Sequence, residues 1–101
     1  MIKHIVFFQL ADEAEGRSKA ENALLLKNEF EKLIDLIPVL RRIEVGINHP
    51  ETPAGNYDLS LYCEFDSVED LNIYQEHPDH KKVGALISKI RTGRACVDYE
   101  V

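Results

Sequence analysis

The stretch YDLSLYCEF, residues 57–65, alternates apolar and mostly polar side chains with a period of two. The apolar positions are Tyr57, Leu59, Leu61, Cys63 and Phe65. This alternation is typical of a strand in an antiparallel sheet that buries one face in a core. The stretch therefore predicts a half-buried β-strand, and other segments of the chain must cover its apolar face.

Two more strands are predicted on the N-terminal side of this stretch. The opening MIKHIVFFQL predicts a strand over residues 2–10 with apolar side chains on both faces, as in a central strand covered on both sides. In this strand His4 shares a face with Val6 and Phe8. VLRRIEVGI, residues 39–47, alternates in the same way and predicts the second strand. The segment that follows, NHPETPAGN, is rich in turn residues and predicts a loop.

A helix is predicted between the first two strands. SKAE, residues 18–21, has the pattern of a capping box, and Pro38 predicts where the helix ends. An earlier start, at Asp12, is an open alternative. The buried side of the helix is predicted from apolar residues at helical spacing, namely Leu26, Phe30, Leu33, Ile34 and Ile37.

A second helical region and a last strand are predicted after residue 65. Ser67 begins a helix that runs toward Glu76 and is interrupted at Pro78. Asp79 is predicted to cap the segment that follows, and Gly93 to end it. Between them, helical spacing resumes with Val83, Leu86, Ile87 and Ile90, and ACVDYEV, residues 95–101, predicts the last strand.

The order strand-helix-strand-strand-helix-strand predicts an α+β, ferredoxin-like fold with one antiparallel sheet, and residues 1–101 form a single domain. In this fold the spatial order of the strands is 4-1-3-2, and the helices lie on one face of the sheet. No segment of the chain is left to cover the opposite face. A homodimer in which two sheets close face to face, as a dimeric α/β barrel, is therefore predicted.

Composition and charge limit the classes of function. The chain is 45% apolar with a net charge of −6, and no basic face of the kind that binds phosphates is visible, so nucleic-acid binding is not predicted. No apolar run approaches the roughly 18 residues of a membrane span. The short apolar run at the start is followed by the acidic ADEAE, which argues against a signal peptide and favours a cytoplasmic protein.

The two cysteines, Cys63 and Cys96, have neither CxxC nor zinc-finger spacing. On strands two positions apart in the sheet they would lie beyond the reach of a disulfide. Both are predicted to be free thiols.

Three segments, MIKHIVFFQL, YDLSLYCEFDSVEDLNIYQEHPDHKKV and VDYE, resemble the stress-responsive α/β-barrel domain family, called Dabb. The likeness covers essentially the whole chain, and its most specific part is the pattern Y-x-x-H-P-x-H. The resemblance implies a ferredoxin-like dimer whose sheets form a barrel. Many members of this family have no known activity.

A plant branch of the family is similar and catalyses aldol-type cyclisation of linear polyketides without any cofactor. The resemblance implies that Tyr74 and His80 stand where that branch has its catalytic Tyr and His, and that His4 lines the same cavity. The chain departs from the branch at Leu59, where the branch has a His, and at Phe30, where it has a Tyr. The cavity predicted here is therefore more apolar, with fewer hydrogen-bond donors.

The stretch YQEHPDHKKV gives these residues a chemical interpretation. A bend at Pro78 would let His80 converge on Tyr74. His80 would then be a general base, and Tyr74 would donate a hydrogen bond to a developing enolate. His77 is either part of the ligand site or a polar residue at the helix break. A metal site at His77, Asp79 and His80, with His4 or His49 as a further ligand, is not predicted, because side chains that flank a proline diverge in direction.

The resulting prediction is a small homodimeric, stress-responsive Dabb protein that binds an apolar, carbonyl-bearing small molecule between sheet and helices. The predicted catalytic pair is Tyr74 and His80, and no cofactor is predicted. Three alternatives are open: a cofactor-independent cyclase or lyase, a cofactor-free monooxygenase, and a non-catalytic scaffold protein. A hard cation on surface carboxylates is also left open. The predicted ligand-binding residues are His4, Phe30, Leu59 and His77.

Overall fold

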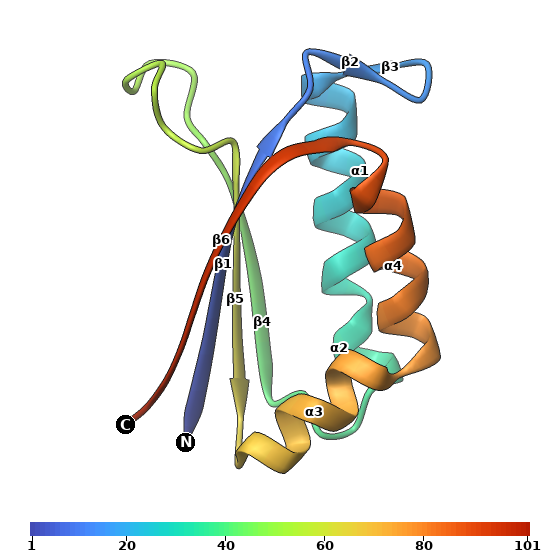
Figure 1. The fold of residues 1–101 in the computed structure, drawn as a ribbon, viewed down its shortest axis with the longest axis vertical. Coiled ribbons are helices and arrows are strands. Elements are labelled where there is room, and N and C mark those ends of the chain that lie inside the picture. Colours follow the sequence, from blue (N-terminus) through green and yellow to red (C-terminus); the bar gives the residue numbers. More distant parts are fainter.

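The computed structural model describes residues 1–101 and has one antiparallel sheet of four strands in the order β4-β5-β1-β6 (Figure 1). The strands are β1 (Ile2–Leu10), β4 (Arg42–Ile47), β5 (Leu59–Phe65) and β6 (Arg91–Glu100). This order is the predicted one, and the ferredoxin-like α+β fold is confirmed.

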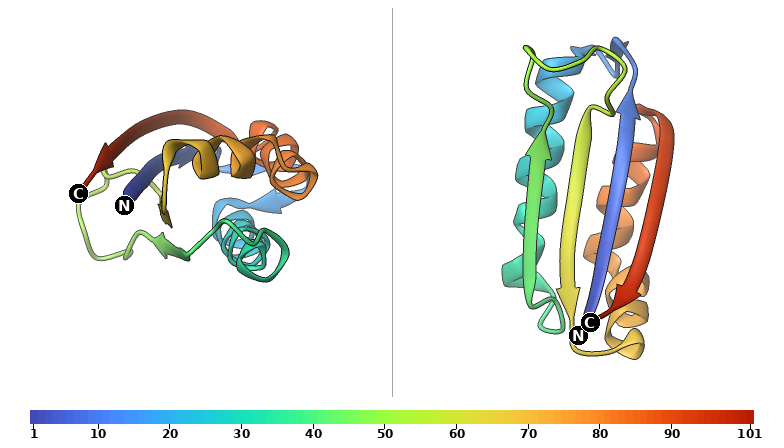
Figure 2. Two further views of the ribbon diagram at one scale, coloured as in Figure 1. Left: turned by 90° about the horizontal axis from the view of Figure 1, so that it is seen from below. Right: turned by 90° about the vertical axis from the view of Figure 1, so that its left-hand side faces the viewer.

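All four helices lie on one side of the sheet, and the other side is open (Figures 1 and 2). They are α1 (Lys19–Glu31), α2 (Leu33–Leu36), α3 (Val68–Glu76) and α4 (Pro78–Ser88). The two chain ends lie side by side, and the amide of Val101 donates to the carbonyl of Met1 at 3.0 Å.

The segment before α1 is a small hairpin, β2 (Glu13–Ala14) and β3 (Arg17–Ser18), so the helix does not begin at Asp12. Glu15 and Gly16 form its turn with φ values of 53° and 74°. Positive φ is readily adopted by glycine but is strained for most other residues, and it lies outside the right-handed helical region. A helix therefore cannot run through this turn. The predicted capping box is confirmed, because Ser18 accepts from the amide of Glu21 and the Glu21 side chain accepts from the amide of Ser18.

Some predicted boundaries were wrong. The first helical region divides at Lys32 into α1 and α2, and Ile34 is exposed, because it lies on the flank of the stripe, about 80° round the helix from Leu26. α4 ends at Ser88, so Gly93 does not cap a helix. Gly93 lies within β6, where an added Cβ would come within 2.5 Å of the side chain of Gln9.

The core lies between the sheet and the helices. Alternation along β1 and β5 sends every second side chain into it, as predicted for β5. β1 was predicted to be covered on both sides, but its second face is open within this chain, with Phe7 exposed. The buried side chains of the core from the helices include Leu26, Phe30, Tyr74 and Ile87, and those from the sheet include Val6, Phe8, Leu61 and Phe65. β5 begins at Leu59 rather than Tyr57, so Tyr57 stands outside the strand and packs against Phe7.

The open face of the sheet carries exposed apolar side chains beside charged ones. Phe7, Val97 and Tyr99 are 41%, 59% and 40% exposed. Arg42 pairs with Glu64 at 3.9 Å on this face. Arg94 does not belong to this face, because it lies opposite Phe8 in the β1–β6 ladder and so shares the face that the helices cover.

Cys63 and Cys96 are free, as predicted, because β1 lies between the strands that carry them. None of the helices combines the length and the apolar character that crossing a membrane requires.

Candidate functional site

A cavity of about 130 Å³ lies between α4 and the helix-covered face of the sheet. Its wall is mostly apolar, with two imidazoles and two guanidinium groups. The lining residues are Val6, Phe8, Phe30, Leu61, Gly84, Ile87, His4, His80, Arg91 and Arg94.

The break between α3 and α4 sets the position of His80. Pro78 is the first residue of α4, and His77 before it is extended, with φ −64° and ψ 136°. The imidazole Nδ1 of His77 accepts from the amide of Asp79 at 3.1 Å, so the cap of α4 is His77 and not the predicted Asp79. Proline is favoured at the first helical position, which leaves the residue before it as the cap. His77 therefore holds the helix start and does not line the cavity.

His80 lies in the first turn of α4 with its side chain toward the sheet. Its Nδ1–H donates to the carbonyl oxygen of Gln75 at 3.1 Å. In the neutral ring that bond leaves Nε2 as an acceptor. Burial lowers the pKa of His80, and the nearby His4, Arg94 and His77 lower it further, although the bond to Gln75 opposes this. His80 is therefore neutral at pH 7 and can accept a proton.

Tyr74 is fully buried against His80, with ring centroids 4.4 Å apart. The thiol of Cys63 donates to the hydroxyl oxygen of Tyr74 at 3.9 Å. Burial raises the pKa of Tyr74 above its ordinary value and that of Cys63 to about 12, so both groups stay protonated. The structure thus brings Tyr74 and His80 together, but Tyr74 lies outside the cavity lining.

His4 reaches the cavity from β1 and is 2% exposed. Its Nδ1–H donates to Asp98 Oδ1 on the neighbouring strand β6 at 2.5 Å. Asp98 was not singled out from the sequence. Alternation in ACVDYEV places Asp98 on the same face as Cys96. A carboxylate on the helix-covered face needs a polar partner, and this requirement could have pointed to Asp98 from the sequence.

Phe30 lines the cavity, stacked on Phe8 with centroids 6.2 Å apart. Leu59 is buried but does not line it, and Leu61 does. In the β1–β5 ladder Leu61 lies opposite Val6, and Leu59 lies opposite Phe8.

Arg91 and Arg94 were visible in the sequence only as part of a short basic run. Both are exposed residues at the start of β6, and both line the cavity. They add positive charge to the wall of the cavity in a chain of net charge −6.

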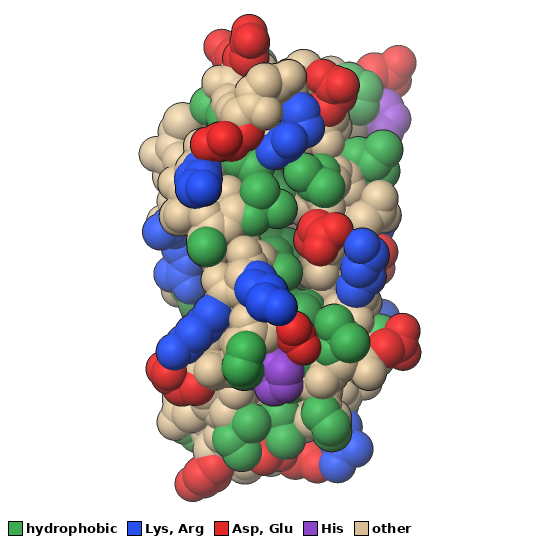
Figure 3. All heavy atoms as spheres, turned by 90° about the vertical axis from the view of Figure 1, so that its right-hand side faces the viewer, with side chains coloured by type: hydrophobic (Ala, Val, Ile, Leu, Met, Phe, Trp, Pro, Cys, Tyr) green, Lys and Arg blue, Asp and Glu red, His purple; other side chains and the backbone are tan.

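A larger hollow of about 700 Å³ lies against the loop around residues 48–57 and the adjoining strands. Of its lining residues only His49 and Tyr57 are ionisable. It includes Phe7 and Ser60, whose side chains belong to the open face of the sheet. The outer surface of the helices differs from both, with apolar side chains flanked by charges of both signs (Figure 3). The smaller cavity is therefore the place where reactive groups gather.

Comparison with known proteins now identifies the family. The family described as the Stress responsive A/B Barrel Domain, Dabb, matches residues 2–101. The chain belongs to the Dabb family. Among relatives, it is 31% identical over 101 residues to the Arabidopsis thaliana stress-response A/B barrel domain-containing protein DABB1. The match covers 98% of this chain and 46% of that relative, so this Dabb chain spans about half of the relative's length.

Solved structures share the fold of this chain. A dimeric protein of unknown function and ferredoxin-like fold from Bacteroides fragilis is 38% identical, with a TM-score of 0.79 and coverage of 99% of this chain and 95% of that one. A dimeric ferredoxin-like protein of unknown function from Thermobifida fusca is 28% identical, with a TM-score of 0.80 and coverage of 99% and 90%.

Two more distant structures are of proteins that are named as enzymes. The hydroxynitrile lyase of Passiflora edulis is 16% identical to this Dabb chain, with a TM-score of 0.77 and coverage of 99% of this chain and 92% of the lyase. An antibiotic biosynthesis monooxygenase is 13% identical, with a TM-score of 0.70 and coverage of 100% and 98%. At such identities the likeness shows the fold alone.

Proposed function

We propose that this Dabb protein is a homodimer that binds an apolar, carbonyl-bearing small molecule in the cavity between sheet and helices. The observation that carries the proposal is the cavity itself, whose apolar wall contains the side chains of His4 and His80. Pockets for small molecules are mostly apolar, with a few polar groups that fix the orientation of the ligand.

The open face of the sheet supports the homodimer. Phe7, Val97 and Tyr99 are exposed there, and no segment of the chain covers them. Exposed apolar patches on a sheet commonly mark interaction surfaces. The relatives from Bacteroides fragilis and Thermobifida fusca are described as dimeric. Two copies packed through this face would bury these side chains and close the predicted barrel.

The size of the cavity limits its occupant. At about 130 Å³ it is slightly smaller than a dry cavity of about 150 Å³ that accommodates benzene in another protein. The ligand is therefore a compact molecule of about six to eight heavy atoms, or the reactive end of a longer one. A carbonyl oxygen placed beside His80 would lie near Arg94, which also lines the cavity and whose charge lowers the pKa of His80.

A second candidate function is cofactor-independent proton transfer of the cyclase or lyase type. The observation that favours it is a neutral His80 in the cavity wall, its Nδ1 held by Gln75 and its Nε2 left as an acceptor. Nε2 could remove a proton from the carbon next to a carbonyl group. Tyr74 contacts the ring of His80, and its hydroxyl, which accepts from the Cys63 thiol, would have to reach into the cavity to donate to a ligand.

Native mass spectrometry of protein purified without a metal-affinity column tests the proposal. The expected result is a dimer that carries an organic molecule, whose mass gives the ligand class. A monomer would contradict the homodimer. A dimer that carries nothing and binds none of a panel of small ketones would contradict the ligand site and favour the scaffold alternative.

A further inference from the structure

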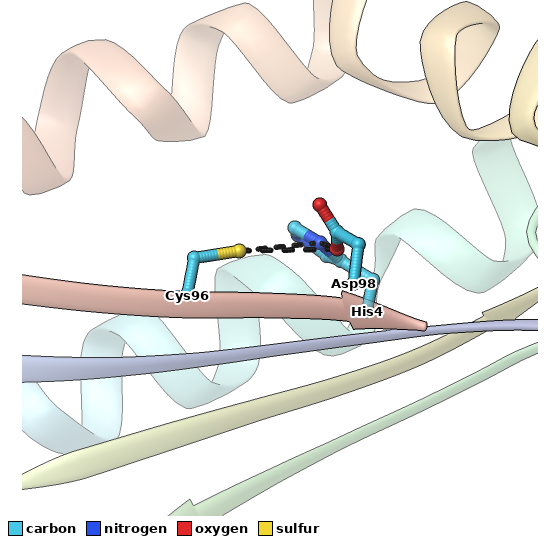
Figure 4. Close-up of side chains that lie close together, drawn as sticks. All are labelled: His4, Cys96 and Asp98. Atoms are coloured by element: carbon cyan, nitrogen blue, oxygen red, sulfur yellow. Dashed lines mark hydrogen bonds and ion pairs between the residues drawn. The ribbon is translucent and has the colours of Figure 1, made fainter. Parts of the chain in front are cut away.

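Three side chains with metal-binding atoms converge at the edge of the sheet. His4 Nδ1 lies 3.7 Å from Cys96 Sγ and 2.5 Å from Asp98 Oδ1, and Sγ and Oδ1 are 3.8 Å apart (Figure 4). This cluster is the only group of three or more His, Cys, Asp or Glu residues in the structure whose ligand atoms lie this close together.

The sheet register holds the cluster in place. Asp98 is directly opposite His4 in the β1–β6 ladder, and Cys96 precedes Asp98 by two residues on the same strand. Residues two apart on a strand share a face, so all three side chains point to the side that the helices cover. Their positions are set by paired backbone rather than by a mobile loop.

Burial differs among the three in a way that suits ion entry. His4 is 2% exposed, so packing fixes its imidazole. The side chain of Asp98 is 41% exposed, and Cys96 is half-buried. An ion can therefore reach the cluster from solvent at the edge strand, while the buried imidazole supplies a preorganised ligand.

The spacing is close to that of a tetrahedral site. Zinc bonds of about 2.0–2.1 Å to nitrogen and oxygen and about 2.3 Å to sulfur place nitrogen and oxygen about 3.3 Å apart and sulfur about 3.6 Å from each. Both distances to Cys96 Sγ already agree with this. The contact between His4 and Asp98 has to open by about 0.8 Å, which rotation of the exposed Asp98 side chain can provide.

We propose that His4, Cys96 and Asp98 bind a transition-metal ion of borderline softness, with Zn²⁺ as the best fit. A thiolate and an imidazole favour Zn²⁺ over Mg²⁺ and Ca²⁺, which prefer oxygen ligands. On binding, the thiol of Cys96 releases its proton to solvent, and the proton of His4 moves from Nδ1 to Nε2. Three protein ligands leave the fourth position to water. This site goes beyond the proposed ligand cavity and does not depend on it.

The test is a titration of tag-free, chelator-treated protein with Co²⁺, which reports its ligands by absorption, followed by displacement with Zn²⁺. The expected result is one Co²⁺ per chain, a thiolate-to-cobalt charge-transfer band and the intense visible bands of tetrahedral cobalt. Cys96→Ser should remove the charge-transfer band, and Asp98→Asn should weaken binding at least about tenfold, since even outer-shell partners of a metal site change affinity about 10–100-fold.

Matched controls are the variants Cys63→Ala, which removes the other thiol, and His49→Gln, which removes an exposed loop histidine. Both should bind Co²⁺ as the unaltered protein does. Circular dichroism verifies that each variant is folded, and the exposed position of Asp98 makes Asp98→Asn informative even if His4 variants fail to fold. Absence of the charge-transfer band would overturn the proposal, as would Cys96→Ser binding Co²⁺ unchanged or His49→Gln abolishing binding.

Discussion

The two faces of the sheet are made by alternate residues of the same strands, yet they have different uses. On β1, His4, Val6 and Phe8 point toward the helices, whereas Ile5 and Phe7 point to the open side. The helix-covered face keeps a small cavity with imidazoles in its wall. The open face has no cover within the chain.

The reactive groups of the proposed site lie on the covered face, and the proposed dimer contact lies on the open face. Groups on the covered face can have shifted pKa values because α4 excludes water from them, as it does for His80. In the proposed homodimer, groups on the open face would pack against a second copy. Changes on one face should therefore leave the property of the other face intact.

The largest expected effect is on proton transfer by His80. Cyclohexanone is a compact ketone, and its α-hydrogens exchange with deuterium when a base removes them. We expect the protein to accelerate this exchange and His80→Gln to reduce the acceleration by about 10²–10⁴-fold, because a general base has been lost. Exchange is followed by NMR in D₂O, with His49→Gln as the control. Equal rates for the protein and for His80→Gln would exclude His80 as the base.

Next in size is the loss of the dimer when the open face is charged. Val97 is 59% exposed in the single chain, and an unpaired carboxylate buried at this position opposes association. Val97→Asp should weaken dimerisation at least about 100-fold, equivalent to about 2.7 kcal/mol. Analytical ultracentrifugation measures the constant. Ile73→Asp is the control, since Ile73 is also exposed, at 52%, but lies on helix α3. Equal effects of the two substitutions would refute this face as the interface.

A smaller effect is expected on the pH dependence of stability. The folded protein holds His80 with a lowered pKa, so the unfolded chain binds its proton more readily as pH falls below about 6.5. Stability is therefore complete above that pH and declines below it, by at most about 1.4 kcal/mol per pH unit for one proton. Urea unfolding between pH 5 and 8 should show a shallower decline for His80→Gln. An unchanged slope would mean that α4 does not desolvate this group.

The smallest effect is expected for Tyr74→Phe. This substitution removes only the hydroxyl that accepts from the Cys63 thiol, and thiols are weak donors. The free energy of unfolding should fall by about 0.5–1 kcal/mol, with cyclohexanone exchange nearly unchanged. A loss of exchange comparable to that of His80→Gln would instead assign the hydroxyl a direct role with the substrate.

Much of the fold could be predicted because it depends on local patterns. The bounds of β1 and the capping box at Ser18 follow from the alternation and spacing of neighbouring residues. The prediction for Gly93 was wrong because a glycine that follows a helical pattern resembles a helix cap. In the structure Gly93 packs closely against Gln9, and a side chain at position 93 would disturb that contact.

The candidate site was harder to predict because it depends on register between distant strands. The partner of His4 is Asp98, 94 residues away, and only the pairing of β1 with β6 brings them together. Register also places Leu61 opposite Val6, and both line the cavity. The contact between Tyr74 and His80 was accessible to prediction, because the proline that bends the chain lies between them in the sequence.

The measurement that tests the ligand site most directly uses Gly84, a cavity residue on α4. An added Cβ at this position meets no atom within 4 Å, so a side chain can enter the cavity without strain. We predict that cyclohexanone, titrated by NMR, shifts the signals of cavity residues in the unaltered protein and in Gly84→Ala. In Gly84→Leu the side chain fills the space, and binding should fall at least about tenfold while the dimer persists. Equal binding by Gly84→Leu would contradict the assignment of the ligand to this cavity.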